Sequence, residues 1–527
     1  MKRRFLVSVL LVFGLLAPVV AQRQGDEFVI SFLQGNVQLN PIQSFTASEA
    51  QIYTGLYEGL VTYHPLTMEP VAAVAEDWEI SDDRLVYTFS LRDDARYWNG
   101  ERVTAAHFRD TWLKLIDPET DAAYNFLFDI IDGVREYRTG QIESPREVGI
   151  EAVNARTLRV TLRKPATHFL RILCHHAFVP VHPSVRDLED WSELEEIPGN
   201  GPFRLVERSA DELLLERNRR YWARDEVQLE RVRLVFTDED DDTVTDRFNR
   251  GEIDWVTSGM SLADVQFPET IVVNPLFATT YYFLRSDLEP FSDERVRRAL
   301  ALLLPWDEIR DPEIQFLPAD TLVPQIPFYP EISGITEPDR EEALSLLQEA
   351  GYSRGVRLPT IEVHVPQGQE TMRVARLMQE NWESELEVNV DIRVTPYPAY
   401  FDALDDESFT VGTVSWIGDF ADPLTFLQMW ISDSNVNDAG FRDQRYDQLI
   451  DESMLESGED RYQILSQAEQ ILLDTGTVLP ISHSPSINLI DLDLVEGWFP
   501  NPLDIHPLRY LRFSDQSAAP GVINFRY

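Results

Sequence analysis

The sequence predicts an α/β fold that is divided into several domains, and three observations support this class. Stretches with strand periodicity and stretches with helical periodicity alternate along the whole chain. Between Ile361 and Tyr397 a strand, a helix and a second strand follow one another in the order of a parallel crossover unit. The 527 residues correspond to about three domains, and no internal repeat of roughly 20–50 residues organises them.

In the N-terminal half, alternating apolar residues predict strands, and apolar residues at helical spacing predict helices. Ser48 is the expected N-cap of the first helix, and Asn99-Gly100 is a strong turn signal. The expected elements are a strand and a glycine turn in Phe28–Pro41, a helix in Thr46–Tyr63, a strand in Leu85–Leu91, a helix over Ala105–Leu115 and a strand in Arg156–Pro165.

The C-terminal half continues the same mixture of elements. Ser292 and Arg295 begin one expected helix, and Gly351 is the expected C-cap of the next. The proline-rich stretch Pro305–Pro330 predicts a long irregular surface loop. The expected elements are a hairpin in Gly199–Trp222, a strand, helix and strand in Val232–Val256, helices in Ser292–Leu304 and Arg340–Tyr352, the crossover unit, and a helix over Arg461–Asp474.

The chain is extremely acidic, with 90 Asp and Glu against 46 Lys and Arg and a formal net charge of −44. This balance argues against nucleic acid and against anionic membrane surfaces, because both select basic patches. The charge keeps the protein in solution. Lysine occurs only at Lys2, Lys114 and Lys164, and an acidic surface with so little lysine would suit a salty or alkaline habitat.

The N-terminus has the pattern of a secretory signal peptide. Basic residues at 2–4 precede the apolar run Phe5–Leu16, and Val19 and Ala21 occupy the small-residue positions of a cleavage site, so we expect cleavage after Ala21. The apolar run is too short for a comfortable membrane span. No cysteine stands at the cleavage site to carry a lipid anchor, so a soluble exported protein is expected.

Catalytic and metal-binding motifs are not found in the sequence. There is no P-loop, G-x-S-x-G, H-E-x-x-H or C-x-x-C, although carboxylates are too numerous to exclude a glycosidase-type acid pair. Cys174, the only cysteine, allows no intrachain disulfide and is expected to be buried and inert. Cys174 and His175 would point to opposite faces of a strand, and the pair His175-His176 fits structural histidines better than a metal site. The acidic run Asp238–Asp242 lacks the spacing of a calcium loop. We therefore expect no cofactor and no metal.

The segment WIGDFADPLTFLQMW, Trp416–Trp430, contains two aspartates among apolar and aromatic residues. Asp422 precedes Pro423 and an apolar run, which indicates a helix N-cap. Asp419 follows a predicted strand and lies between a glycine and a phenylalanine, where a carboxylate is costly to bury unless a positive group meets it. Two interpretations remain open: Asp419 caps a turn or pairs with a nearby arginine, or it binds a cationic ligand group.

The order and spacing of several segments resemble the extracytoplasmic solute-binding proteins of peptide ABC importers, the oligopeptide/dipeptide-binding family. The resemblance covers almost the whole chain after the signal peptide. The segment Leu56–Phe108 is similar to the most recognisable block of the family. Further similarity lies in GNGPFRLVE, in ERNRRYW, in WIGDFADPLTFL and in NPLDIHPLRYL.

The resemblance implies two α/β lobes with mixed sheets, joined by a hinge that lets them close over a ligand, and an additional domain beside the first lobe. It implies a periplasmic protein that delivers short peptides to the permease subunits of an ABC transporter, without catalysis, and that acts as a monomer. The expected division is signal peptide 1–21, first lobe 22–63, 195–280 and 482–527, additional domain 64–194, and second lobe 281–481.

The resemblance also implies a binding site. In oligopeptide-binding members the aspartate that Asp419 matches receives the free α-amino group of the ligand. The peptide would lie as an added β-strand against backbone groups near Val37 and around Ser415 and Ile417. Trp416 would form a pocket wall, with ordinary core packing as the alternative, and Tyr124 aligns with a family tyrosine that lines the cleft.

The sequence departs from the family pattern at two positions. Family members that bind peptides of one fixed length carry basic residues that bind the ligand carboxylate, whereas the aligned residues here, Thr371 and Thr413, are neutral. Ligand length therefore stays open, and so does a non-peptide ligand such as a sugar, haem or a metal complex. Asp419 favours an amine-bearing ligand over a neutral sugar. A secreted peptide or glycan hydrolase and a sensory binding protein are the alternatives from other classes.

Overall fold

The computed structural model describes residues 27–33, 37, 39–44, 46–166, 168–188, 190, 191, 194, 196–237, 243–315, 317–352, 358–396, 399–404 and 409–514. The predicted signal peptide, the glycine turn after the first strand and the acidic run Asp238–Asp242 lie outside these residues. Among the described residues, no helix combines the length and the apolar character needed to cross a membrane.

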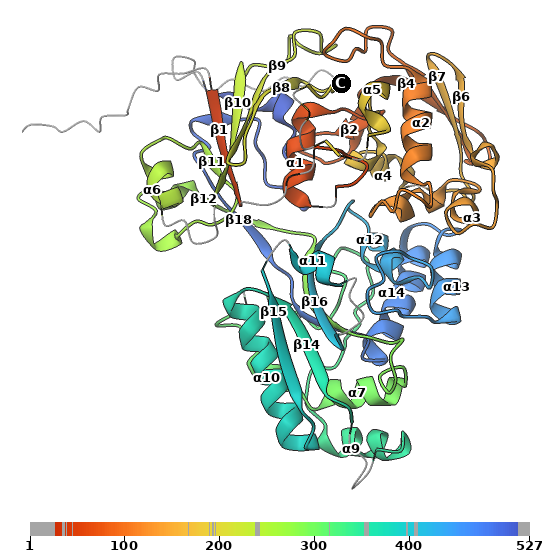
Figure 1. Cartoon of the computed structure of the whole chain (residues 1–527), viewed down its shortest axis with the longest axis vertical. Helices are drawn as coiled ribbons and strands as arrows, with labels where there is room; N and C mark the ends of the chain where they lie inside the picture. Colours follow the sequence, from red (N-terminus) through yellow and green to blue (C-terminus); the bar gives the residue numbers. More distant parts are fainter. Residues whose placement is uncertain are drawn as a thin grey trace, which may run out of the picture.

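A seven-stranded mixed sheet forms the first lobe, at the upper left of Figure 1. Its strands are β1 Glu27–Leu33, β8 Phe203–Arg208, β9 Glu212–Arg217, β10 Arg231–Thr237, β11 Trp255–Val256, β12 Ile271–Pro275 and β18 Pro485–Ile490. The order is β12-β18-β11-β1-β10-β9-β8, with β1 parallel to both of its neighbours. The predicted hairpin is confirmed, because β8 and β9 pair antiparallel.

A five-stranded sheet forms the second lobe, in the lower half of Figure 1. Its strands are β13 Ala278–Leu284, β14 Ile361–Pro366, β15 Val390–Thr395, β16 Val411–Ile417 and β17 Val478–Ser482. The order is β15-β14-β16-β13-β17. The crossover prediction is confirmed, since β14 and β15 pair in parallel and are connected through α10 (Gln369–Leu386).

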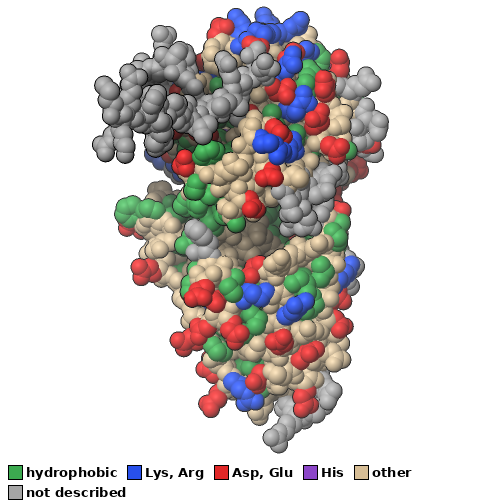
Figure 2. All heavy atoms as spheres, turned by 90° about the vertical axis from the view of Figure 1, so that its left-hand side faces the viewer, with side chains coloured by type: hydrophobic (Ala, Val, Ile, Leu, Met, Phe, Trp, Pro, Cys, Tyr) green, Lys and Arg blue, Asp and Glu red, His purple; other side chains and the backbone are tan. Residues whose placement is uncertain are grey.

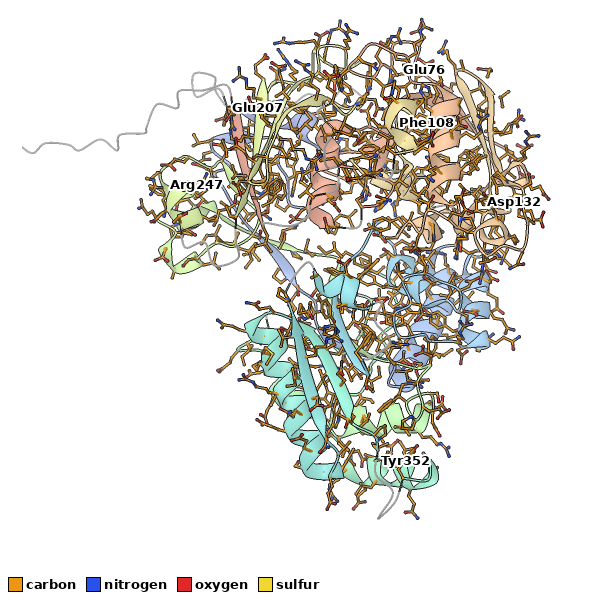
Figure 3. All side chains as sticks on the ribbon, viewed as in Figure 1. Glu76, Phe108, Asp132, Glu207, Arg247 and Tyr352 are labelled. Atoms are coloured by element: carbon orange, nitrogen blue, oxygen red, sulfur yellow. The ribbon has the colours of Figure 1, made fainter. Side chains whose placement is uncertain are left out.

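A four-stranded antiparallel sheet lies beside the first lobe, in the order β4-β5-β7-β6. Its strands are β4 Ala75–Ile80, β5 Val86–Leu91, β6 Ile150–Asn154 and β7 Thr157–Thr161. The helix α2 covers Ala105–Leu115 as predicted, and it buries Phe108 and Trp112 completely. Figure 3 shows Phe108 inside this part of the molecule, whereas Tyr352 lies at the far tip of the second lobe.

The remaining helices and short strands complete the three parts. The helices are α1 Ala47–Leu56, α3 Val134–Arg138, α4 Phe169–Ile172, α5 Pro183–Arg186, α6 Thr243–Asn249, α7 Glu294–Leu302, α8 Trp306–Ile309, α9 Arg340–Glu349, α11 Ala399–Leu404, α12 Leu424–Leu427, α13 Gln444–Ser453 and α14 Gly458–Asp474. The short strands are β2 Val61–Tyr63, β3 Pro70–Ala72, β19 Val495–Glu496 and β20 Arg512–Phe513.

Two helix starts differ from the prediction. The N-cap of α1 is Thr46 and not Ser48, because Thr46 and Glu49 form a reciprocal capping box. The N-cap of α7 is Asp293 and not Ser292, since the Asp293 carboxylate accepts the backbone N–H of Arg295. Gly351 follows α9 with a φ of +92°, the left-handed conformation expected of a glycine C-cap.

The chain passes twice between the two larger sheets, through residues 276–277 between β12 and β13 and residues 483–484 between β17 and β18. The three sheets draw their strands from different stretches of the chain, and we propose that they mark the two lobes and the additional domain with the boundaries given above. The strands depart from those boundaries in three places, because β13 begins before residue 281, β17 ends at Ser482 and β2 pairs with β3.

Candidate functional site

A cavity of about 430 Å³ lies between the two larger sheets. Figure 2 shows that the molecular surface is hollowed at the same level, between the upper and lower halves. The cavity walls come from α1 and the segment after it, from the loop around His175, from β16 and α11 of the second lobe, and from residues 503–509. Every part of the fold therefore contributes to one site.

Of the six site residues named from the sequence, five line this cavity: Tyr124, Ser415, Trp416, Ile417 and Asp419. Val37 is not among its described lining residues and packs instead against the large apolar core. Trp416 is half-buried, and its indole N–H is buried without a hydrogen-bond partner in the described part of the chain.

Asp419 directly follows the strand β16 and Gly418. A Cβ at Gly418 would come within 2.9 Å of Phe277 and Thr425, so only glycine lets the backbone pack this closely. The backbone N–H of Asp419 donates to the Thr425 hydroxyl at 2.8 Å, and that hydroxyl donates to Oδ2 of Asp419 at 3.2 Å. The Asp419 carbonyl accepts from the Tyr63 hydroxyl at 3.3 Å.

The Asp419 carboxylate is buried and has no Lys or Arg partner among the described residues. Burial raises its pKa from 3.8 to about 7, although its bonds with Thr425 and the backbone act in the opposite direction. The group that faces it is His175, whose Nε2 lies 3.8 Å from Oδ1. A buried carboxylate that lacks a cation is the arrangement that a cationic ligand group would complete.

His175 faces Asp419 as a neutral imidazole. Burial holds the pKa of His175 well below its usual range, and the neighbouring His176 adds to this effect. Its Nδ1 accepts the backbone N–H of Ala177 at 3.2 Å, so the ring proton belongs on Nε2, the atom directed at Asp419.

Asp422 has the partner that Asp419 lacks. Arg461 donates to both of its oxygens, at 2.7 and 2.8 Å, and the backbone N–H of Leu424 donates to Oδ1. Burial alone would raise the pKa of Asp422, but the ion pair with Arg461 brings it below 3.8. The helix α12 begins at Leu424 and its N-cap is Pro423. The prediction that Asp422 is the N-cap is therefore wrong by one position, although the Asp422 carboxylate accepts the backbone N–H of Leu424.

The loop from Cys174 to His176 is not a strand, which corrects the assumption made from the sequence. It connects α4 to a short 3₁₀ helix, His176–Phe178, and the rings of His175 and His176 lie 4.1 Å apart. Tyr124 packs against His175 with a ring separation of 4.4 Å. Among the described residues no group of three or more His, Cys, Asp or Glu is arranged to hold a metal ion.

One edge of β16 is open toward this cavity. The strand pairs with β13 along its whole length, whereas β14 pairs with it only at Val411. The backbone N–H and C=O of Thr413 both bond to the Tyr400 hydroxyl at 3.0 Å, on the side away from β13. Because backbone groups alternate sides along a strand, those of Ser415 and Ile417 point to the same open side.

Two residues that align with carboxylate-binding positions of the family make internal contacts. Thr413 lines the cavity, but its hydroxyl donates to the carbonyl of Tyr281 at 2.9 Å. Thr371 is not among the lining residues, and its hydroxyl donates to the carbonyls of Pro366 and Gly368.

Several lining residues were not identified from the sequence. They are Tyr53, Tyr57, Tyr63, His175, Tyr400, Phe401 and the buried ion pair Glu58–Arg509. Glu58 and Arg509 are separated by 451 positions in the chain, so no local spacing could have indicated their contact. The aromatic residues of the segment before Tyr63 could be read from the sequence. Their helical spacing fits a buried core as well as a cavity wall, so it did not identify them as site residues.

Comparisons with known proteins agree with this fold. The family model for bacterial extracellular solute-binding proteins, family 5 Middle, matches residues 69–438. The chain is 29% identical over 461 residues to the dipeptide-binding protein DppE of Bacillus subtilis, and the alignment covers 84% of each protein.

Solved structures show the same architecture. The murein tripeptide-binding protein MppA of Escherichia coli superposes with a TM-score of 0.83 at 26% identity, covering 92% of this chain and 98% of that one. The unliganded open form of MppA gives a TM-score of only 0.64 at the same identity, covering 94% and 98%. Haemophilus influenzae OppA in complex with the peptide RPPGFSPFR gives 0.80 at 25% identity, covering 93% and 99%.

Proposed function

The chain belongs to the bacterial extracellular solute-binding proteins of family 5, and on this basis we propose that it binds short peptides between its lobes and delivers them to the permease of an ABC importer. The family is one of solute-binding proteins, which supports a capture site over a catalytic one. The predicted signal peptide and the extracellular family both support a site of action outside the cytoplasm.

The observation that carries the proposal is the open edge of β16 that leads to Asp419. A peptide added along Ser415 and Ile417 would bond through main-chain groups, which tolerate many side-chain sequences. Its free amino group would reach the Asp419 carboxylate, where an ammonium ion stabilises a charge that is otherwise buried without a cation. The residues Trp416 and Tyr124 would contact the first side chains of the ligand.

Lobe closure would complete the site. The higher TM-score against one MppA structure than against its unliganded open form supports a closed arrangement of the lobes here. Closure excludes water from the cavity and brings Asp419 of the second lobe against His175 of the additional domain. Opening would release the peptide to the permease.

Thermal unfolding tests the proposal. The protein is first unfolded and refolded to remove any co-purified ligand, and then heated with peptides of two to five residues and with their N-acetylated forms. A free peptide at 100 times its dissociation constant should add about 2.7 kcal/mol of stability. The proposal fails if free peptides give no stabilisation while a sugar or a metal complex does.

A peptide hydrolase is the second candidate, because a buried acid with a pKa near 7 in a cavity is also typical of catalytic sites. The geometry gives it little support, since Nδ1 of His175 already accepts a backbone N–H and the Asp419 carboxylate accepts a hydrogen bond from Thr425. Mass spectrometry after prolonged incubation separates the two functions: binding leaves the peptide intact, and hydrolysis yields fragments.

A further inference from the structure

The charged side chains that line the cavity are few. Among the described lining residues, Glu58, Asp419 and Arg509 are the only Asp, Glu, Lys or Arg. The two lining histidines are neutral near pH 7, because burial lowers the pKa of His176 to about 3 and that of His175 well below its usual range. The undescribed positions that adjoin lining segments in the sequence, 45 and 397–398, contain no Lys, Arg or His.

Arg509, the one arginine among the described lining residues, already has carboxylate partners. Its Nη1 donates to Oε1 of Glu58 at 3.2 Å, and its Nη2 donates to Glu226 at 2.6 Å. The guanidinium carbon also lies over the rings of Tyr221 and Trp222, at 5.8 and 5.2 Å from their centroids. Its charge is thus matched by Glu58, which leaves only Nε without a hydrogen-bond partner among the described residues.

The described lining residues therefore contribute one unmatched carboxylate and no unmatched cation. We propose that the cleft recognises the amino end of its ligand and has no binding group for a carboxylate, so its ligands are peptides with a free amine whose carboxyl end is blocked or lies beyond the cavity. This inference rests on the proposed peptide-binding function and specifies the ligand class.

The open edge of β16 supports the same conclusion. A peptide whose amine lies at Asp419 and whose chain follows Ile417 and Ser415 next meets the Tyr400 hydroxyl, which already bonds both backbone groups of Thr413. Pro366, Tyr400 and Phe401 line the cavity in this direction, and none of them carries a charge. A carboxylate that ended here would lose water without gaining a cation, which is strongly unfavourable.

Calorimetric titration of the ligand-stripped protein with one tripeptide tests the proposal. Tri-alanine is used as the free acid, as the C-terminal amide and as the N-acetylated acid. We expect the Kd of the amide to be no more than threefold above that of the acid, and acetylation to weaken binding at least 30-fold. A dipeptide and a pentapeptide, each used as the acid and as the amide, distinguish a carboxyl end that must be blocked from one that lies beyond the cavity. If the acid binds more weakly than the amide only for the dipeptide, longer chains carry their carboxylate out of the cavity.

The proposal is overturned if the acid binds more than threefold tighter than the amide, a result that would point to Nε of Arg509 and leave the peptide function intact. If neither form binds, the proposed function itself fails. Ser415→Arg adds a cation at an exposed position of the wall, with Ser415→Gln as the matched control. The arginine variant is expected to bind the acid at least tenfold more tightly than the amide, and the glutamine variant to bind both equally. The comparison of acid and amide on the wild type decides the proposal on its own.

Discussion

At the scale of single residues, Asp419 and Asp422 show how the surroundings decide the role of a carboxylate. The two side chains are three positions apart and both are buried, but among the described residues only Asp422 forms an ion pair with an arginine. Because the native pKa of Asp419 lies above its ordinary value of 3.8, its contribution to folding stability is present below about pH 3.8 and is lost as the pH rises through about 7. Asp419 therefore destabilises the ligand-free protein at neutral pH.

This leads to a prediction for Asp419→Asn. The amide keeps the hydrogen bond with Thr425 but carries no charge, so the ligand-free variant should unfold at a higher temperature than the wild type at about pH 8. The same variant should bind free peptides at least 100-fold more weakly, because the ammonium loses its counter-ion. Thermal unfolding and calorimetry measure the two effects, and a fall in the stability of the ligand-free variant at this pH would show that Asp419 is structural.

Asp422→Asn is the matched control. It leaves Arg461 buried without a counter-ion, and removal of one partner of a buried pair costs about 3–5 kcal/mol. The two substitutions are chemically identical and three positions apart, but they should change stability in opposite directions above pH 7. If both destabilise the protein equally, the difference in environment described here is wrong.

At the scale of elements, α1 and β16 supply opposite walls of the cavity. The capping box of Thr46 and Glu49 fixes the start of α1, and Thr46 itself lines the cavity. Thr46→Ala should therefore lower the free energy of unfolding by about 1 kcal/mol. Ser48→Ala is the control and should have almost no effect on stability, since Ser48 does not cap the helix. Chemical denaturation of both variants shows which of the two residues is the N-cap of α1.

The sequence allowed the long elements to be predicted, but not the feature that makes β16 a binding edge. Helical periodicity placed α2 correctly, and the crossover unit was visible because strand, helix and strand are contiguous. The open side of β16 depends on its pairing with β13, where Thr280 and Ser415 are 135 positions apart. Asp419 could be singled out because nothing local explained it, whereas Arg461 and Arg509 find their partners only in the folded chain.

At the scale of the whole molecule, the additional domain and the second lobe contact each other outside the cavity. Arg135 of α3 forms two hydrogen bonds with Asp433, both at 2.8 Å, and Arg138 donates to the Asp433 carbonyl at 3.0 Å. Lys164 donates to the carbonyl of Asp451 in α13 at 2.9 Å. Figure 1 shows α3 above α13. These contacts join the additional domain to the second lobe, so we expect them to break when the lobes open and to favour closure without touching the ligand.

Asp433→Asn should therefore weaken the binding of all peptides by one common factor of about 3 to 10, because apparent affinity scales with the closed fraction. A change in the cavity wall would alter the ranking of ligands instead. Glu216→Gln is the control, since it removes the exposed pair Arg204–Glu216 within the first lobe. Titration with three different peptides measures the factor. A factor that varies between peptides would show that Asp433 does not act by stabilising the closed state.

The central claim, that Asp419 binds the amino group of a peptide, is tested most directly by a thermodynamic cycle. Binding of one tripeptide and its N-acetylated form is measured by calorimetry on the wild type and on Asp419→Asn. Because the two changes remove the same contact, we predict that the acetylated peptide binds both proteins with equal affinity, so the losses do not add. Losses that add fully would show that the amine is bound elsewhere and that Asp419 has another role.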